Sequence, residues 1–160
     1  MPSLIMRLEP LNGAAAGDSH AVSPNGLVSE DARNTPLGRW SSAVAAAHDA
    51  CLVLDPHGSI VSVSAPAVEL LGCSGVGVIG RPLLDVIDVV DLESGTSDPD
   101  YAGRIPPLVA LDGGGLSRSL MRVRHHDESR VSLDASSAPL HDAAGKTVGS
   151  VSFFARVDPA

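Results

Sequence analysis

Alternating apolar and polar residues predict three β-strands in the last third of the chain. The two kinds of residue alternate over residues 118–124 and again over residues 131–136. Turn-forming residues at 126–129 and 142–146 separate the runs, and an apolar run over residues 148–157 follows the second turn. Because side chains on a strand point alternately to its two faces, this pattern indicates an antiparallel meander.

A β-hairpin and several short helices are predicted before the meander. Residues 51–55 and 60–64 have the apolar, partly β-branched content of strands, and Pro56-His57-Gly58 between them has the composition of a tight turn. Helical spacing, alanine content and helix-stop residues predict four short helices, at residues 43–50, 67–71, 83–90 and 105–111. This order of elements predicts an α+β domain with a five-stranded antiparallel sheet and helices on one face.

The first 38 residues differ from the rest of the chain. They contain four prolines and show no sustained helical or strand period. We therefore expect a disordered tail over residues 1–38 and a folded domain over residues 39–158. The apolar cluster of Leu4, Ile5, Met6 and Leu8 would suit a short docking segment, but chain ends are commonly disordered, and we expect disorder here as well.

Size, charge and cysteine content limit the classes of protein that fit. At 160 residues and 16.3 kDa, the chain has room for one ordinary domain. A net charge of −8 disfavours binding to a phosphate backbone, and four aromatic residues are few for base stacking. Two cysteines exclude a disulfide framework. Neither a membrane helix nor a secretory signal is recognisable, so we expect a cytoplasmic protein that binds neither nucleic acid nor membrane.

No group of residues has the spacing of a catalytic or metal site. The six histidines are dispersed, and none stands four residues from another as helical zinc ligands do. The glycine run at 113–115 lacks the lysine of a phosphate-binding loop, and no nucleophile is spaced with a base. We therefore expect neither catalysis nor a bound metal.

Three motifs, taken in order, resemble those of the PAS domain family. The first is LDPHGSIV followed by SAPAVELLG within residues 54–72, with Ser64 where the family commonly has asparagine. The second is VIGRPL at residues 78–83, and the third is APLHDAAGKTVG at residues 138–149. The resemblance spans about residues 43–157, which is nearly all of the predicted domain.

The resemblance implies a PAS-like sheet of strand order 2-1-5-4-3 and a ligand pocket facing the helices. Four apolar residues of the meander would line that pocket: Met121, Val123, Leu133 and Phe153. Measured against the cofactor sites known in the family, the sequence supports no bound cofactor, and only a non-covalent flavin stays open. No cysteine follows Gly80-Arg81, where flavin photosensors of the family carry a reactive one, and residues 91–115 contain no histidine that could bind a haem iron.

The function implied by the resemblance is signalling by binding. We expect a stand-alone bacterial sensor or adaptor domain that binds a small ligand or a protein and passes its state to a histidine kinase, a phosphatase or a transcription regulator. Two alternatives remain open. One is a small α+β enzyme or ligand carrier with a cone-shaped cavity, which a cavity-facing aspartate or histidine with a perturbed pKa would indicate. The other is a PAS fold used only for dimerisation.

Two surfaces are candidates for protein contacts. The helix expected to end at residue 50 carries a stripe of small apolar residues after a tryptophan, and a homodimer would use Trp40, Val44, Ala47 and Cys51. Packing of this stripe on its own sheet is the alternative. The second surface is a basic docking face for an acidic partner, formed by Arg118, Arg122 and Arg124 on one side of a strand. An ordinary solvated sheet face is the alternative there.

Overall fold

The computed structural model describes residues 29–73, 77–113 and 115–157. The helices of this part are α1 (Glu30–Arg33), α2 (Pro36–Ala45), α3 (Ala65–Leu71), the 3₁₀ helix η1 (Leu83–Asp85), α4 (Pro99–Ala102) and α5 (Pro106–Val109). The strands are β1 (Cys51–Leu54), β2 (Ile60–Val63), β3 (Asp88–Val90), β4 (Ser117–Arg124), β5 (Arg130–His141) and β6 (Thr147–Arg156). None of these helices is long and apolar enough to cross a membrane.

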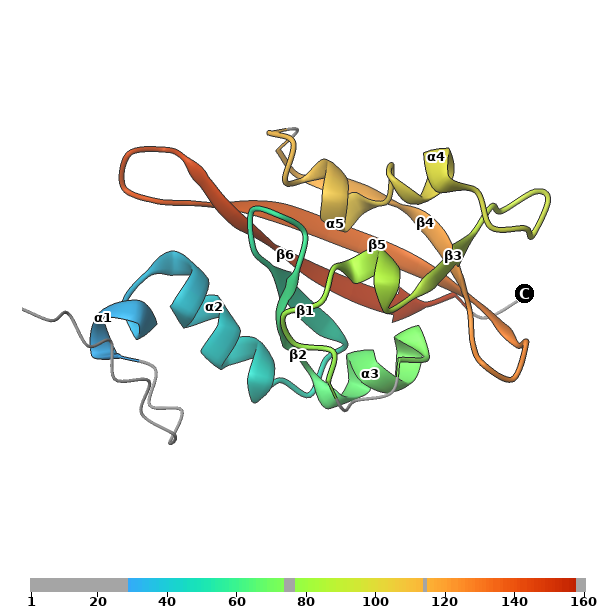
Figure 1. Cartoon of the computed structure of the whole chain (residues 1–160), viewed down its shortest axis with the longest axis horizontal. Helices are drawn as coiled ribbons and strands as arrows, with labels where there is room; N and C mark the ends of the chain where they lie inside the picture. The colour runs from blue at the N-terminus through green and yellow to red at the C-terminus, as the bar shows by residue number, and fades with distance from the viewer. Residues whose placement is uncertain (1–28, 74–76, 114, 158–160) are drawn as a thin grey trace, which may run out of the picture.

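The strands form one antiparallel sheet in the order β2-β1-β6-β5-β4-β3 (Figure 1). This confirms the predicted fold class. It also confirms the predicted order of five strands, because β4, β5 and β6 are the three strands of the predicted meander. The sheet differs from the prediction in having a sixth strand, β3, at the edge beside β4.

Strand β3 corrects the prediction of a helix over residues 83–90. Only η1 is helical there, and the last three residues of the segment pair with the end of β4. Val89 and Val90 are β-branched, which favours a strand. Asp88 lies opposite Arg124, and the two form an ion pair at 2.6 Å. A short apolar run is compatible with helix or strand, and here the pairing with β4 decides between them.

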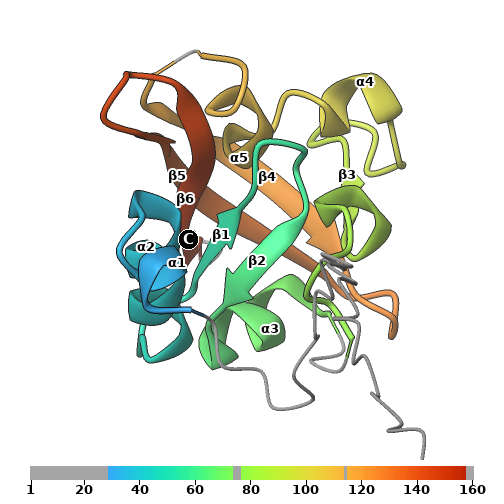
Figure 2. The ribbon, with the colours of Figure 1, turned by 60° about the vertical axis from the view of Figure 1, so that its left-hand side comes forward.

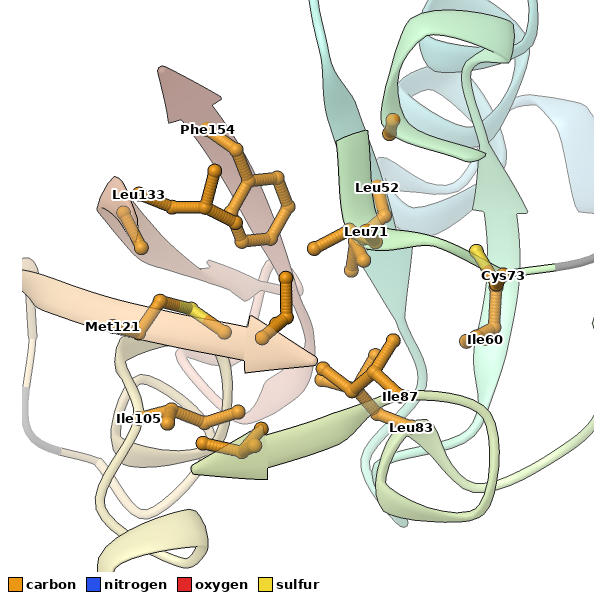
Figure 3. Close-up of a cluster of buried hydrophobic side chains, with 14 of the residues drawn as sticks. Leu52, Ile60, Leu71, Cys73, Leu83, Ile87, Ile105, Met121, Leu133 and Phe154 are labelled. Atoms are coloured by element: carbon orange, nitrogen blue, oxygen red, sulfur yellow. The ribbon is translucent and has the colours of Figure 1, made fainter. Parts of the chain in front are cut away.

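The larger hydrophobic core lies on the inner face of the sheet, the face covered by α3, η1, α4 and α5. Figure 3 shows side chains of the sheet and of these helices pointing toward one another. Met121, Leu133 and Phe154 come from adjacent strands, and Leu71 and Leu83 come from α3 and η1. Helices of one or two turns are unstable alone in water, so burial against this core is what stabilises them.

Helix α2 covers part of the opposite, outer face of the sheet (Figure 2). Its Val44 is only 2% exposed and packs in a second core with Val53, Leu140 and Val151. In β1, Leu52 and Leu54 belong to the inner core, while Cys51 and Val53 belong to the outer core. Helices therefore lie on both faces of the sheet, whereas the sequence predicted helices on one face.

Helix α2 also corrects the bounds of the helix predicted over residues 43–50. It begins at Pro36 and ends at Ala45. The side chain of Thr35 caps its start by accepting a hydrogen bond from the Gly38 amide at 3.1 Å. Proline in the first turn needs no hydrogen-bond acceptor and has a helical φ already. Pro36, one of the prolines on which the prediction of a disordered tail rested, is thus the first residue of this helix.

The folded domain begins before residue 39. Helix α1 and the first turn of α2 lie within the segment expected to be a disordered tail, and Leu37 packs against the outer core. The expectation of disorder is therefore corrected for residues 30–38. The remainder of the predicted tail, with the apolar cluster of residues 4–8, lies outside the described residues.

The hydroxyl group of Ser64 connects β1, β2 and α3. It donates a hydrogen bond to the Asp49 carbonyl at 2.7 Å and accepts one from the Cys51 amide at 3.0 Å. It also accepts a hydrogen bond from the Ala67 amide at 3.3 Å, which caps α3. One donor and two lone pairs are the full capacity of a hydroxyl group, so Ser64 is completely satisfied although it is buried.

Candidate interaction surface

Three of the four predicted pocket residues lie on the inner face. Met121, Val123 and Leu133 are buried in the inner core. Phe153 instead points to the outer face, and Phe154 occupies the inner position, which corrects the prediction. Consecutive residues of a strand point to opposite faces, so one of the two phenylalanines had to be outside. Because the two residues are adjacent and identical, the sequence alone does not show which of them is buried.

The chemistry of the inner core does not fit a flavin, the cofactor of the photosensors mentioned above. The ring system of a flavin carries nitrogen and oxygen atoms that need hydrogen-bond partners. The buried polar side chains available there are serines that are already bonded, Ser137 to Ser152 at 2.7 Å and Ser150 to the Pro107 carbonyl at 3.0 Å. No buried side-chain nitrogen or oxygen of the described residues lacks a partner. We therefore derive no chemistry from a flavin.

Purified protein is expected to show no absorbance band above the near ultraviolet. The reason is the apolar inner core, whose few buried serine hydroxyl groups are bonded to one another or to the backbone. An absorbance spectrum of the native protein, combined with a spectrum of the supernatant after acid precipitation, measures this directly. A Soret band or a flavin band at near-stoichiometric occupancy would contradict the expectation.

The part of the outer face that α2 leaves uncovered carries large apolar side chains. We call this surface the open sheet face and define it by Trp40, Leu120, Phe153, Ala155 and Val157. Trp40 is 39% exposed, Phe153 is 42% exposed and Leu120 is 49% exposed. The rings of Trp40 and Phe153 meet edge to face, with centroids 6.4 Å apart. Exposed aromatic and aliphatic side chains gathered on one face commonly mark a protein contact.

The strand register brings these side chains together. Phe153 of β6 contacts Trp40 of α2, and Ala155 lies two residues further along the same face of β6. Asp134 of β5 lies between Ala155 and Leu120 in the ladder. The open sheet face therefore runs from Trp40 of α2 across β6 and β5 to β4.

The predicted basic docking face lies on this same outer side, with each guanidinium group already bound. Arg118 donates to the Asp134 carboxylate, with Nε–Oδ1 at 3.0 Å. Arg124 pairs with Asp88. Arg122 donates to the Ser132 hydroxyl at 3.1 Å and to the Leu92 carbonyl at 3.0 Å. Asp134 and Asp88 offset the charges of Arg118 and Arg124, whereas the partners of Arg122 are neutral. Docking of an acidic partner on this face stays a prediction.

The two ion pairs lower the pKa of both carboxylates. Hydrogen bonds from the Arg118 guanidinium hold the pKa of Asp134 below its usual value. Partial burial alone would raise the pKa of Asp88, but hydrogen bonds from Ser97 and Arg124 outweigh burial and lower it. Both carboxylates therefore stay charged at neutral pH and remain paired with their arginines.

Replacing Arg118 by leucine is expected to raise the pKa of Asp134 toward that of a free aspartate. A lowered pKa in the folded state means that the pair stabilises the protein above the unfolded pKa, and that this stability is lost as the pH falls through the folded pKa. The variant should thus lose less stability on acidification than the wild type. Carbon-13 NMR titration of the Asp134 carboxyl group measures the shift, and an unchanged pKa in the variant would contradict it.

The residues predicted as a dimer helix are not one exposed stripe. Val44 and Cys51 are buried in the outer core of their own chain, Ala47 is half-buried, and Trp40 alone is exposed. Val44 and Cys51 are corrected as contact residues, because neither can reach a second molecule without unpacking α2. A dimer contact through Trp40 stays a prediction.

The sequence pattern placed Phe153 in the pocket instead of on this surface. It did not single out Leu120, although one signal for Leu120 was present. Leu120 has the same parity along β4 as the three arginines, and the buried Met121 and Val123 have the other. An apolar residue among outward-facing charges indicates an exposed contact residue. No comparable signal separates Phe153 from Phe154.

Comparisons with known proteins agree with this architecture. The family model of the PAS fold matches residues 44–157. A PAS domain from Colwellia psychrerythraea aligns with a TM-score of 0.56 and 19% identity, over 76% of this chain and 96% of that one. The PAS domain of Bordetella pertussis BvgS aligns with a TM-score of 0.53 and 10% identity, over 77% and 86% of the two chains. The LOV protein of Rhodobacter sphaeroides aligns with a TM-score of 0.58 and 10% identity, over 78% of this chain and 68% of that one. No curated protein matched the sequence.

Proposed function

Because the chain belongs to the PAS-fold family, whose model matches residues 44–157, we propose that it is a signalling domain that acts through protein contacts at its open sheet face. The observation that carries the proposal is the pairing of Trp40 with Phe153 on a surface that α2 leaves uncovered. Aromatic residues are frequent anchors of protein interfaces. The inner core is made of apolar side chains and satisfied serines, and this favours a protein partner over a polar ligand.

A second copy of the same chain is the contact that the charges favour. Arg118 and Asp134 lie side by side on the face, beside Leu120. In a contact with two-fold symmetry, each partner presents the same patch to the other. Arg118 of one copy then lies near Asp134 of the second, and the apolar side chains of both copies cover one another. A patch that carries one charge of each sign is complementary to itself.

The dimer would pass its state on to a signalling protein such as a histidine kinase, a phosphatase or a transcription regulator. Helix α2 contacts the sheet at Val44 and reaches the open sheet face at Trp40. A partner that binds better to one arrangement of α2 on the sheet increases the population of that arrangement. Binding, without any chemical step, is then sufficient to transmit a signal.

Sedimentation of the full chain tests this proposal. We expect a dimer at high micromolar concentration, and we expect Phe153→Arg to be monomeric with an unchanged circular dichroism spectrum. The matched control is Ile79→Arg, because Ile79 is 58% exposed in the loop between α3 and η1, outside the open sheet face. A wild-type monomer at high micromolar concentration would overturn the proposed self-association, as would an unchanged dimer in Phe153→Arg.

A further inference from the structure

A groove of about 600 Å³ lies between α1, α2 and β2, apart from the open sheet face. Figure 2 shows α1 beside α2, with β2 next to them. The groove is lined by Ala32 and Arg33 of α1, by Leu37, Gly38 and Ser42 of α2, and by Val61 of β2. Most of its exposed lining is apolar. Leu37 and Val61 both pack against the outer core and also line the groove.

The wall formed by α1 is fixed in place by local contacts. Gly38 lies so close to the Ala32 carbonyl that any side chain there would collide with it. The Thr35 hydroxyl donates to the same carbonyl at 2.7 Å and accepts from the Gly38 amide at 3.1 Å. Helix α1 has one turn and no buried residue, so burial of its own side chains does not stabilise it. The contacts with α2 hold it where it forms a wall.

We propose that the groove binds residues Leu4–Leu8 of the same chain. These residues supply four apolar side chains, Leu4, Ile5, Met6 and Leu8, from the 28 residues that precede the described part. That part begins at Ser29, the residue that caps α1, so the preceding chain leaves from the wall of the groove. Residues 9–28 can span up to about 70 Å when extended, so the chain is long enough to bring Leu4–Leu8 back to the groove from Ser29.

Charge at the edge of the groove agrees with this segment. Arg33 lines the groove, and among the described residues no carboxylate forms an ion pair with it. Glu9 directly follows the last apolar residue of the segment. A carboxylate next to Leu8 can approach Arg33 while the apolar side chains cover Leu37 and Val61. The segment and the groove therefore match in hydrophobicity and in charge.

Attachment to the domain makes even a weak contact effective. A tether of this length is expected to give an effective concentration on the order of 1 mM. A segment that would bind as a free peptide with a Kd of about 0.1 mM would then occupy the groove about 90% of the time. Burial of four apolar side chains together with one ion pair is expected to give such a weak affinity after the cost of ordering the segment.

Limited trypsin digestion of the full chain tests the proposal, because Arg7 lies inside the segment. We expect the Arg7–Leu8 bond to be cut at least about tenfold more slowly in the wild type than in Ser42→Glu, which places a charge in the groove. The matched control is Ala43→Glu, an exposed neighbour on α2 that does not line the groove, and it should keep the wild-type rate. Ile5→Glu alters the segment alone and should be cut as fast as Ser42→Glu. Intact mass follows the loss of residues 1–7.

Circular dichroism of each variant first establishes that the domain remains folded. Equal cleavage rates in the wild type, Ser42→Glu and Ile5→Glu would overturn the proposal. Protection that increases with protein concentration between about 1 and 100 µM would also overturn it, because the groove would then bind the segment of a second copy. Concentration-independent protection that both variants remove would support binding within one chain. None of these outcomes depends on dimerisation through the open sheet face.

Discussion

Replacing Val44 by aspartate is expected to abolish the native fold. Val44 packs against Val53, Leu140 and Val151, where α2 covers β1, β5 and β6. An unpaired carboxylate there costs several kcal/mol, a large part of the 5–15 kcal/mol by which a domain is usually stable. Far-ultraviolet circular dichroism and urea unfolding measure the loss.

The matched control for this substitution is Ala43→Asp, which puts the same charge one residue away on the exposed side of α2. The control should remain folded and unfold at nearly the wild-type urea concentration. If Val44→Asp kept its secondary structure and only changed from dimer to monomer, then Val44 would contact a second molecule and its placement in the outer core would be wrong.

Replacing Gly149 by alanine is expected to lower the free energy of unfolding by about 3 kcal/mol. A methyl group at this position would collide with the Leu54 carbonyl and lie 2.7 Å from Cδ1 of Leu37. Leu54 is held by its pairing with β6, so its backbone cannot move away without breaking that pairing. Urea unfolding monitored by circular dichroism gives the change in free energy.

Gly103→Ala is the control for the glycine substitution. At Gly103, an added methyl group would be 3.6 Å from the nearest atom, which is ordinary contact, and the backbone there is not left-handed. We expect this variant to unfold within about 0.5 kcal/mol of the wild type. Equal stability of Gly149→Ala and Gly103→Ala would contradict the close approach of β6 to β1.

The sequence predicted the sheet well because its strands have strong local signals. Polar and apolar residues alternate along β4 and β5, and a proline-glycine turn joins β1 to β2. The helices were harder to predict. Helix α2 starts at a proline and contains Gly38, two residue types that usually indicate a break. Gly38 is needed there for its contact with Ala32, a tertiary reason that no local pattern reveals.

The candidate site was predictable only in part, for a similar reason. Alternation along β4 predicted correctly that Arg118, Arg122 and Arg124 share one face. The partners of these arginines lie on other strands, such as Asp134 on β5 and Asp88 on β3. Which charges are paired depends on the strand register, which a single sequence does not specify. The exposure of Phe153 likewise depends on where α2 ends on the sheet.

The hydrogen bonds of Ser64 give the joint between α2 and the sheet a defined position. The carbonyl of Asp49 and the amide of Cys51 are held by one hydroxyl group that also caps α3. Helix α2 ends at Ala45, so only residues 46–48 lie between the helix and this anchor. A displacement of α2 relative to the sheet would therefore change the backbone conformation at these three residues. It would move Trp40 relative to Phe153, while β1 and α3 kept their positions.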